Sequence, residues 1–492
     1  MGRAVRDGGE MVAASATVRR ERRAAPAPSA LERRLALLIA GGGDDRIWLD
    51  PVTRRNRYGA PARPAPDELW FSSSTASPVS PRGWAAAGEA LERLTEPGGL
   101  GIGAWLDQLR ERLLALYGAP GAEAVLAASG TETELVSLCL ALALAEGPLV
   151  NLVVAPAETG SGVPDAASGL HFLGRASLGA AVTKGARLAG WEAAPLRLET
   201  VEIRQTDGAL RRQADVDQEA ALRVERAITS GAFALLHVLD ASKTGRPGVS
   251  RASAAEIASR YPGRVLVVVD ACQLRCPAAQ VRRDLADGFA VMVTGSKFAG
   301  GPAFCGALLL PAAIVERLSR ARFCGAPLAP YSAALDWPRR LSARMDRGLV
   351  QSANLGLGLR WAAALAEIEA YERIPAAWRE AALAEFEHAV RSRVAAAKGL
   401  ALVDAGGEPG APGLVPVLHA DGGDPRRAYL ALARGEGGRR PCHLGQPVAV
   451  GPRWALRVCA SMPMIAGAAE RGFSEIEAGL DETFESWARL RN

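Results

Sequence analysis

The chain has 492 residues, enough for two or three domain-sized units, and its formal net charge at pH 7 is only +5. About half of the residues are apolar and 23% are charged, the balance of a soluble globular protein. The small net charge does not favour nucleic-acid binding, and no apolar run is long enough to cross a membrane. The seven cysteines form no paired CxxC motifs, so we expect no metal site and no disulfide framework, which fits a cytoplasmic protein.

The first 35 residues are rich in Ala, Arg and Pro and lack the apolar block of a secretion signal, so we expect a disordered tail there. Proline-rich pieces at 25–30 and 59–66 indicate that residues 36–80 form an arm rather than a compact domain.

From about residue 81, Ala-rich helical patterns at 84–94 and 105–116 alternate with short apolar runs at 149–155, 233–240, 264–270 and 306–311. Apolar runs without polar alternation indicate strands buried on both faces, and helices between them imply a mostly parallel sheet. A helical pattern over 353–372 is followed by short strand patterns around 402–403, 413–418 and 454–459. The sequence therefore predicts an α/β fold, with a mostly parallel central sheet in a large domain over 81–345 and a smaller α+β domain over 346–492.

Ligands of open α/β sheets gather at the carboxyl ends of the strands, and the first such end here reads SGTETE, from Ser129. Free backbone N–H groups at the start of the following helix suit a phosphate or a carboxylate. Alone, this motif is better explained as an ordinary capping box of Thr131 with Glu134.

Three further strand ends carry polar residues of unusual kinds. Asp270 ends the apolar run of RVLVVVDACQ, and a carboxylate in a partly dry pocket needs a partner such as a protonated ring nitrogen, an arginine or a helix start. Gln273 follows and points an amide at the same pocket. In VTGSKFAGGP, Lys297 follows a predicted strand end and has the chemistry of a Schiff-base nucleophile, although a solvated loop lysine is the simpler interpretation of this motif alone. Arg457, after the last predicted strand, is a natural fork for a carboxylate.

In this order and spacing, the motifs resemble the fold-type-I pyridoxal-phosphate (PLP) enzymes, in particular the class V aminotransferase and cysteine desulfurase group, over about residues 71–460. The resemblance implies that Lys297 is the Schiff-base lysine and that Asp270 keeps the pyridinium nitrogen protonated. It further implies that Arg457 holds the substrate α-carboxylate. The remaining implied cofactor contacts are Gly130, Thr131, Thr294 and Ser296 at the phosphate, and Gln273 and Ser242 at the ring phenolate oxygen.

The same resemblance extends to two serine-rich stretches. SSSTASPVSP is similar to the family's N-terminal active-site stretch, which makes Thr75 and Ser77 candidates for substrate binding. QSAN lies where a neighbouring subunit reaches the phosphate, so Ser352 and Asn354 imply a homodimer with active sites at the subunit interface.

The sequence also departs from the family pattern. In PCHLGQPV, Leu444 stands at the position of the nucleophilic cysteine of one desulfurase branch, and Cys442 is displaced by two residues. Thr159 occupies the position of the residue that stacks on the ring, unless His171 reaches it. His443, beside the desulfurase-like loop, is a further candidate for substrate binding.

These observations predict a PLP-dependent transferase or lyase that acts through an external aldimine at Cα of a small amino acid or amino-acid-derived metabolite, in specialised metabolism. The alternatives are a class V aminotransferase that makes a keto acid, a cysteine desulfurase or C–S lyase, which Leu444 disfavours, and a non-catalytic PLP-binding regulator.

Overall fold

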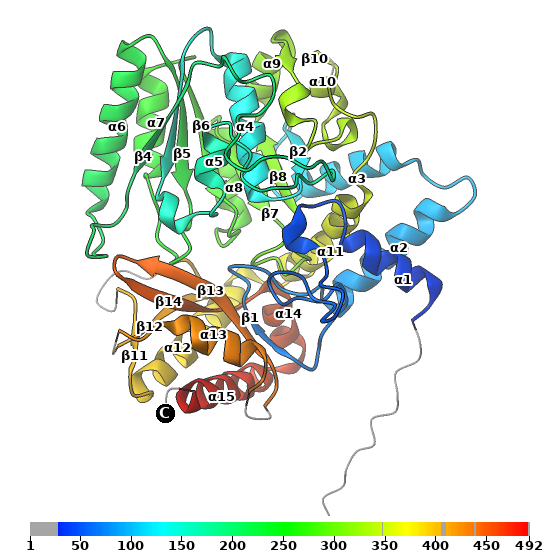
Figure 1. Ribbon diagram of the computed structural model, residues 1–492, viewed down its shortest axis with the longest axis vertical. Helices are drawn as coiled ribbons and strands as arrows, with labels where there is room; N and C mark the ends of the chain where they lie inside the picture. The colour runs from blue at the N-terminus through cyan, green and yellow to red at the C-terminus, as the bar shows by residue number, and fades with distance from the viewer. Residues whose placement is uncertain (1–27, 347, 405–409, 421, 437–438, 491–492) are drawn as a thin grey trace, which may run out of the picture.

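The computed structural model describes residues 28–346, 348–404, 410–420, 422–436 and 439–490, and its two large sheets lie in two parts stacked along the long axis of the molecule (Figure 1). The first 27 residues, most of the predicted disordered tail, lie outside the described residues. Within the described part of the chain, no helix combines the length and apolarity that crossing a membrane requires.

The larger sheet has seven strands, and its five neighbours β7, β6, β5, β3 and β4 run parallel. β8 is antiparallel to both of its neighbours, β7 and β2. The predicted, mostly parallel sheet is thereby confirmed. In spatial order the strands are β2 (Glu123–Ala127), β8 (Gly306–Leu310), β7 (Ala290–Thr294), β6 (Val265–Ala271), β5 (Phe233–Leu239), β3 (Leu149–Val154) and β4 (Leu196–Val201).

Helices cover both faces of this sheet, which explains why its central strands are apolar at nearly every position. α4 (Gly130–Leu144) is itself buried over most of its circumference. The other helices of this part are α5 (Val163–Ala167), α6 (Gln213–Thr229), α7 (Arg251–Arg260), α8 (Ala278–Ala286), α9 (Ala312–Arg320) and α10 (Arg339–Ser342), with a two-stranded sheet of β9 (Phe323–Cys324) and β10 (Met345–Asp346) beside them.

The smaller sheet has the order β1 (Leu69–Phe71), β13 (Cys442–Val450), β14 (Arg453–Cys459), β12 (Leu414–His419), β11 (Leu400–Leu402). β1 pairs in parallel with β13, and all other pairs are antiparallel. The sequence predicted β11, β12 and β14 but neither β1 nor β13. The helices of this part are α12 (Ala376–Ala396), α13 (Pro425–Ala433), α14 (Met462–Arg471) and α15 (Ser474–Arg489). The division of the chain at residues 345 and 346 stays a prediction.

The N-terminal segment is more ordered than its composition suggested. Residues 30–35, placed in the disordered tail by the sequence, are instead the first turns of α1 (Ala30–Ile39). A capping box explains the difference, because Ser29 accepts from the N–H of Glu32 while the Glu32 carboxylate accepts from the N–H of Ser29. α1 packs on α11 (Leu355–Glu372), which also contacts α2 (Pro81–Thr95) and α3 (Ile102–Ala115).

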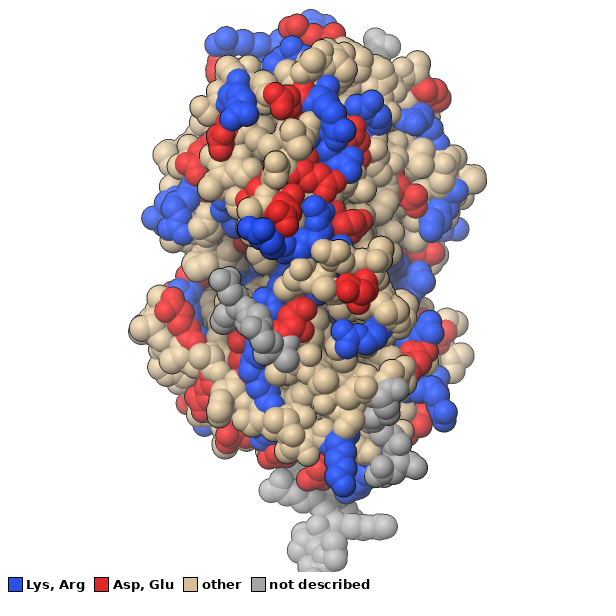
Figure 2. All heavy atoms as spheres, turned by 90° about the vertical axis from the view of Figure 1, so that its left-hand side faces the viewer, with Lys and Arg blue, Asp and Glu red and all other residues tan. Residues whose placement is uncertain are grey.

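Acidic and basic side chains are interspersed, rather than gathered by sign, on the face of the molecule shown in Figure 2. Ion pairs such as that of Arg223 with Glu199 and Glu219 link acidic and basic side chains on α6 and β4. Such a surface favours solubility and gives no strong single-sign field.

Arg360, on α11, fastens the N-terminal segment to the rest of the molecule. Its guanidinium is fully buried and donates to the carbonyl oxygens of Phe304 at 2.6 Å, Ile39 at 3.1 Å and Gly42 at 2.7 Å, and also to that of Gly41. Burial lowers the pKa of Arg360 to about 10. The segment that follows these carbonyls carries two residues of the functional site, described below.

We expect Arg360→Leu to lower the free energy of unfolding by about 3 kcal/mol or more, because it leaves several buried carbonyls without a donor. Urea denaturation measures this loss. The matched control is Arg112→Leu, which removes a half-exposed ion pair with Glu369 and should cost less than about 1 kcal/mol. Equal losses in the two variants would contradict the role given to Arg360.

Candidate active site

A cavity lies at the carboxyl ends of β5, β6 and β7 and reaches the smaller sheet. Its empty volume is about 1020 Å³, including the part that opens to solvent. The structure therefore brings together residues from both parts of the molecule. The predicted site residues that line this cavity are Thr75, Gly130, Thr131, Thr159, Asp270, Gln273, Thr294, Ser296, Lys297 and Arg457.

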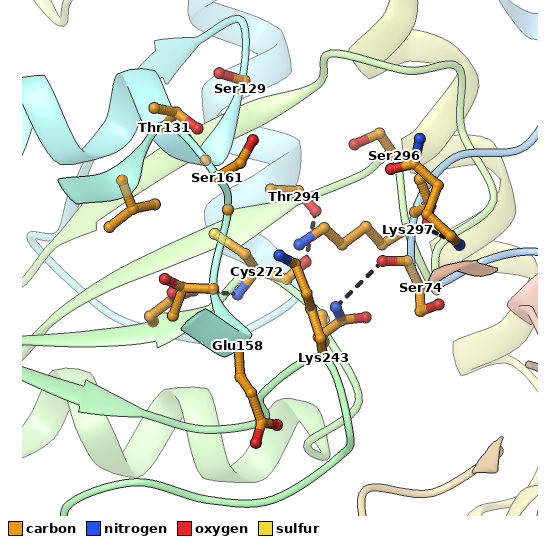
Figure 3. A pocket seen from close by; sticks show the side chains of 18 of the residues that line it. Ser74, Ser129, Thr131, Glu158, Ser161, Lys243, Cys272, Thr294, Ser296 and Lys297 are labelled. Atoms are coloured by element: carbon orange, nitrogen blue, oxygen red, sulfur yellow. Dashed lines mark hydrogen bonds between the residues drawn. The ribbon is translucent and has the colours of Figure 1, made fainter. Parts of the chain in front are cut away.

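The start of α4 forms one end of the cavity, where Ser129, Gly130 and Thr131 lie together with Ser161 (Figure 3). Ser129 is the N-cap and accepts from the N–H of Glu132, so the predicted capping by Thr131 is wrong. A side chain at Gly130 would bring its Cβ within 2.7 Å of Cys272 Sγ. Glycine lets this helix start lie against the end of β6 without displacing the Cys272 thiol, and the free N–H groups at its tip suit an anion.

The Glu132 carboxyl, in the first turn of α4, is buried and accepts hydrogen bonds from the N–H of Ala128 at 2.9 Å and from Ser177 Oγ. Burial raises the pKa of Glu132 to about 8, with the Asp44 carboxylate adding to the effect. At neutral pH this carboxyl is mostly protonated. A neutral Glu132 does not cancel the positive end of the α4 dipole, which stays available for an anion in the cavity.

Asp270 and Gln273 line the floor of the cavity, near the end of β6. Asp270 Oδ1 accepts from the N–H of Cys272 at 3.0 Å, which fixes the carboxylate at the edge of the sheet. Gln273 Nε2 donates to the carbonyl of Ser74 at 3.3 Å. Among the described residues, Gln273 Oε1 and Ser74 Oγ are buried without a hydrogen-bond partner. Two buried polar atoms left unpaired beside a cavity indicate that a polar ligand completes the site.

Lys297 follows β7, and its side chain points into the cavity (Figure 3). The small residues around it explain its motif. A Cβ at Gly301 would lie 2.6 Å from the carbonyl oxygen of Gly295, and Gly300 has a φ of +74° in a turn whose N–H donates to the Lys297 carbonyl. The Gly-Gly pair therefore lets the chain fold back closely behind the lysine.

Lys243, which the sequence analysis missed, extends into the same cavity from the loop between β5 and α7 (Figure 3). Its backbone N–H donates to the carbonyl of Glu158 at 2.8 Å. Burial, together with the nearby charges of Arg457 and Lys297, lowers the pKa of the Lys243 ammonium to about 8. The signal was in the sequence, because Lys243 follows the apolar run of β5 as Asp270 ends that of β6.

Arg457 lies inside β14 rather than after it, and it is almost fully buried. Its guanidinium donates to the carbonyl of Gln446 at 2.7 Å and to Thr75 Oγ1 at 3.0 Å. Burial lowers the pKa of Arg457 to about 10. Arg46 and Tyr58, from the segment held by Arg360, also line the cavity and were not predicted.

Three of the predicted site residues are engaged elsewhere. Ser242 Oγ donates to Glu158 Oε2 at 2.6 Å. Ser77 lies next to Pro302 in an isolated β-bridge. His443 stacks on Trp70 with ring centroids 3.7 Å apart and bonds through Nε2 to Glu68 at 2.8 Å. None of the three lines the cavity within the described part of the chain.

The QSAN residues also lie away from this cavity. Asn354 caps α11 by accepting from the N–H of Leu357 at 3.0 Å, and it donates to the Gly42 carbonyl at 2.8 Å. Both ends of its amide are therefore occupied within the chain. Ser352, two residues earlier, is exposed.

The positions that would serve desulfuration or ring stacking are also occupied in other ways. Leu444 is buried in β13, opposite Phe71. Cys442 is buried against Thr483 with 3.1 Å between Sγ and Oγ1, and burial raises the pKa of this thiol to about 12. His171 bonds to Tyr331 at 2.7 Å and does not line the cavity, whereas Thr159 does.

Comparisons with known proteins agree on the fold. No family model matches the chain, and no curated protein matches it. Among solved structures, the cysteine desulfurase CsdA from Escherichia coli is 13% identical, with a TM-score of 0.56 over 86% of this chain and 95% of that one. A C-DES mutant with glycine covalently linked to its PLP cofactor is 15% identical, with a TM-score of 0.53 over 84% and 96%. SPT with a PLP internal aldimine is 14% identical, with a TM-score of 0.51 over 86% and 88%. These likenesses confirm the predicted fold, which is that of the fold-type-I PLP enzymes.

The buried Glu132 carboxyl predicts a specific pH dependence of stability. Its pKa is raised from 4.5 to about 8 in the folded chain, so the unfolded chain binds fewer protons between these values. Its contribution to stability is full below about pH 4.5 and is lost as the pH rises toward 8, by about 1.4 kcal/mol per pH unit. Glu132→Gln does not titrate, so we expect its stability relative to the wild type to increase from pH 5 to pH 7.5.

Urea denaturation at the two pH values measures this difference. Glu256→Gln, at an exposed carboxylate paired with Arg260, is the control and should change stability by less than about 1 kcal/mol at either pH. If wild type and Glu132→Gln lose stability in parallel, Glu132 does not carry a raised pKa.

Proposed function

We propose that the chain binds PLP in this cavity and is a PLP-dependent transferase or lyase acting at Cα of a small amino acid or amino-acid-derived metabolite. The observation that carries the proposal is the convergence of an amine, a carboxylate and a free helix start in one cavity, from Lys297, Asp270 and α4. Two of the solved structures that share this fold are of proteins with PLP.

The residues present fit the cofactor. The tip of α4, with Gly130 and Thr131, would hold the phosphate, and Thr294 and Ser296 lie near enough to line the same cavity. Asp270 would face the ring nitrogen, and the unpaired Gln273 Oε1 and Ser74 Oγ would meet polar groups of the bound ligand. When bound, PLP supplies an electron sink that stabilises negative charge at Cα of an attached amino acid.

The chain supplies binding and proton transfer. Lys297 would hold the cofactor covalently through its amine and, once released, would carry a proton at Nζ to or from Cα as general base and acid. Arg457 would bind the substrate α-carboxylate, since its guanidinium is buried at the cavity wall and contacts only neutral oxygens. Thr75, bonded to Arg457, would help to orient it.

Cysteine desulfuration is the less favoured alternative. Leu444 and Cys442 lie outside the cavity, and the thiol of Cys442 has a raised pKa. Cys272 does line the cavity, but burial raises the pKa of its thiol well above its ordinary value, which opposes a role as nucleophile. Transamination to a keto acid uses the same residues and remains the alternative within the proposed class.

Three finer parts of the proposal rest on the sequence. Thr159 and Leu444 depart from the family pattern, which supports a role in specialised metabolism. The exposed Ser352 supports a homodimer in which QSAN approaches the partner's cavity. The cysteine usage supports a cytoplasmic location.

The proposal is tested by cofactor trapping. Purified protein incubated with PLP should be yellow, and borohydride should bleach it and fix the cofactor on Lys297, as peptide mass spectrometry would show. We expect Lys297→Ala to lose the covalent label and to lower turnover of amino acids by at least about 10²–10⁴-fold, the usual value of a positioned general base or acid.

Lys184→Ala removes an exposed lysine beside Asp165 and should retain label and turnover. A covalent label that persists in Lys297→Ala would show that another lysine holds the cofactor. Mass spectrometry of products from a panel of amino acids distinguishes keto-acid formation from elimination or replacement.

A further inference from the structure

Lys243 has no task in the function proposed above, although its ammonium enters the same cavity as Lys297 (Figure 3). The two lysines follow different strands, β5 and β7, and their charges act on each other. A lysine in a partly buried place beside other cations is unfavourable unless a partner compensates its charge.

The described residues supply no direct partner for this ammonium. Glu158 is the acid that attracts it, but both oxygens of that carboxylate are engaged. Arg204 Nε donates to Oε1, while Ser242 and Thr244 donate to Oε2. Glu158 also lines the cavity, but its carboxylate is turned away from the tip of the Lys243 side chain (Figure 3).

The other cations of the cavity differ in whether a carboxylate neutralises their charge. Arg46 is paired with the buried Asp44 carboxylate at 2.7 Å, in a two-bond contact. Arg457 contacts only carbonyl and hydroxyl oxygens. Within the described residues, Lys243 and Arg457 are therefore two cavity cations without a bonded carboxylate, and they come from different parts of the molecule.

The anions already assigned to the site do not account for Lys243. The cofactor phosphate has its cradle at the start of α4, where Figure 3 shows Ser129, Thr131 and Ser161 together, away from the tip of Lys243. The substrate α-carboxylate has Arg457. An amino acid that also filled the space at Lys243 would need a second negative group there.

We propose that Lys243 binds an anionic group on the substrate side chain, so that this site takes acidic amino acids. The inference rests on the proposed function. A neutral substrate side chain would leave the Lys243 ammonium desolvated and unpaired. The preference for acidic over neutral substrates therefore comes from this desolvation cost as well as from the gain of an ion pair. Carboxylate and phosphate-ester side chains share this chemistry.

The test uses the PLP-loaded protein and measures dissociation constants from the change in its visible spectrum. The acidic ligands are L-aspartate, L-glutamate and O-phospho-L-serine, and the neutral matches are L-asparagine, L-glutamine and L-serine. We expect at least one acidic ligand to bind about 10- to 100-fold more tightly than its neutral match, and the best of the three distinguishes a carboxylate from a phosphate ester. Succinate against butyrate, which have no amine to react, repeats the comparison by calorimetry.

Lys243→Met should remove most of this discrimination while leaving binding of the neutral ligands within about threefold, and Lys243→Arg should retain much of it. Lys184→Met, at the exposed lysine, should behave as the wild type. Equal affinity for acidic and neutral ligands in the wild type, or unchanged discrimination in Lys243→Met, overturns the inference. Loss of PLP affinity without a change in discrimination overturns it too, because Lys243 is then a cofactor contact. If the wild type takes up no PLP, the proposed function itself fails, a result distinct from all of these.

Discussion

The parallel direction of β5, β6 and β7 is the constraint on which the site depends. Parallel neighbours end at the same edge of the sheet, so the residues directly after these strands lie close together, whatever course the loops then take. Lys243, Asp270 and Lys297 each lie at or just beyond one of these ends. Apart from His237 in β5, the residues that precede the ends of these strands are apolar and buried, so the charged groups of the site lie at the rim of the sheet.

The partners of each charged side chain then determine which of them are available to bind a ligand. Acids that would compete with a ligand are neutralised or occupied: Glu132 by protonation, Glu158 by Arg204 and two hydroxyls. The cavity is lined by a helix start, two amines and two guanidinium groups, of which that of Arg46 is paired with Asp44. Asp270 is the lining acid that has no ion-pair partner among the described residues. Taken together, these groups suit a ligand with several negative charges and one cationic ring, as the proposed function requires.

The sequence predicted those site residues that stand next to recognisable strand or helix ends. Asp270 and Lys297 stand beside long apolar runs, and Gly130 stands before a long helical pattern. These patterns were enough to place all three residues at the edge of the sheet. Lys243 obeyed the same rule and was passed over for its neighbour Ser242, whose hydroxyl turns to a buried carboxylate that no local pattern reveals. Arg46 and Tyr58 reach the cavity only through tertiary contacts of an N-terminal segment without strand periodicity. The three-residue β1 is too short to show any period, and its pairing with β13 is a long-range event.

That pairing has a consequence for biosynthesis. Glu68 and His443 bond across 375 positions of sequence, and Ser74 and Thr75, just after β1, close one wall of the cavity. A ribosome extends the chain from its N-terminus at about 5–20 residues per second, so this wall must wait for tens of seconds until its partner strand emerges. The nascent chain thus displays an incomplete pocket and an unpaired strand for most of its synthesis. Capture of the proposed cofactor would then be a late event that reports a finished polypeptide.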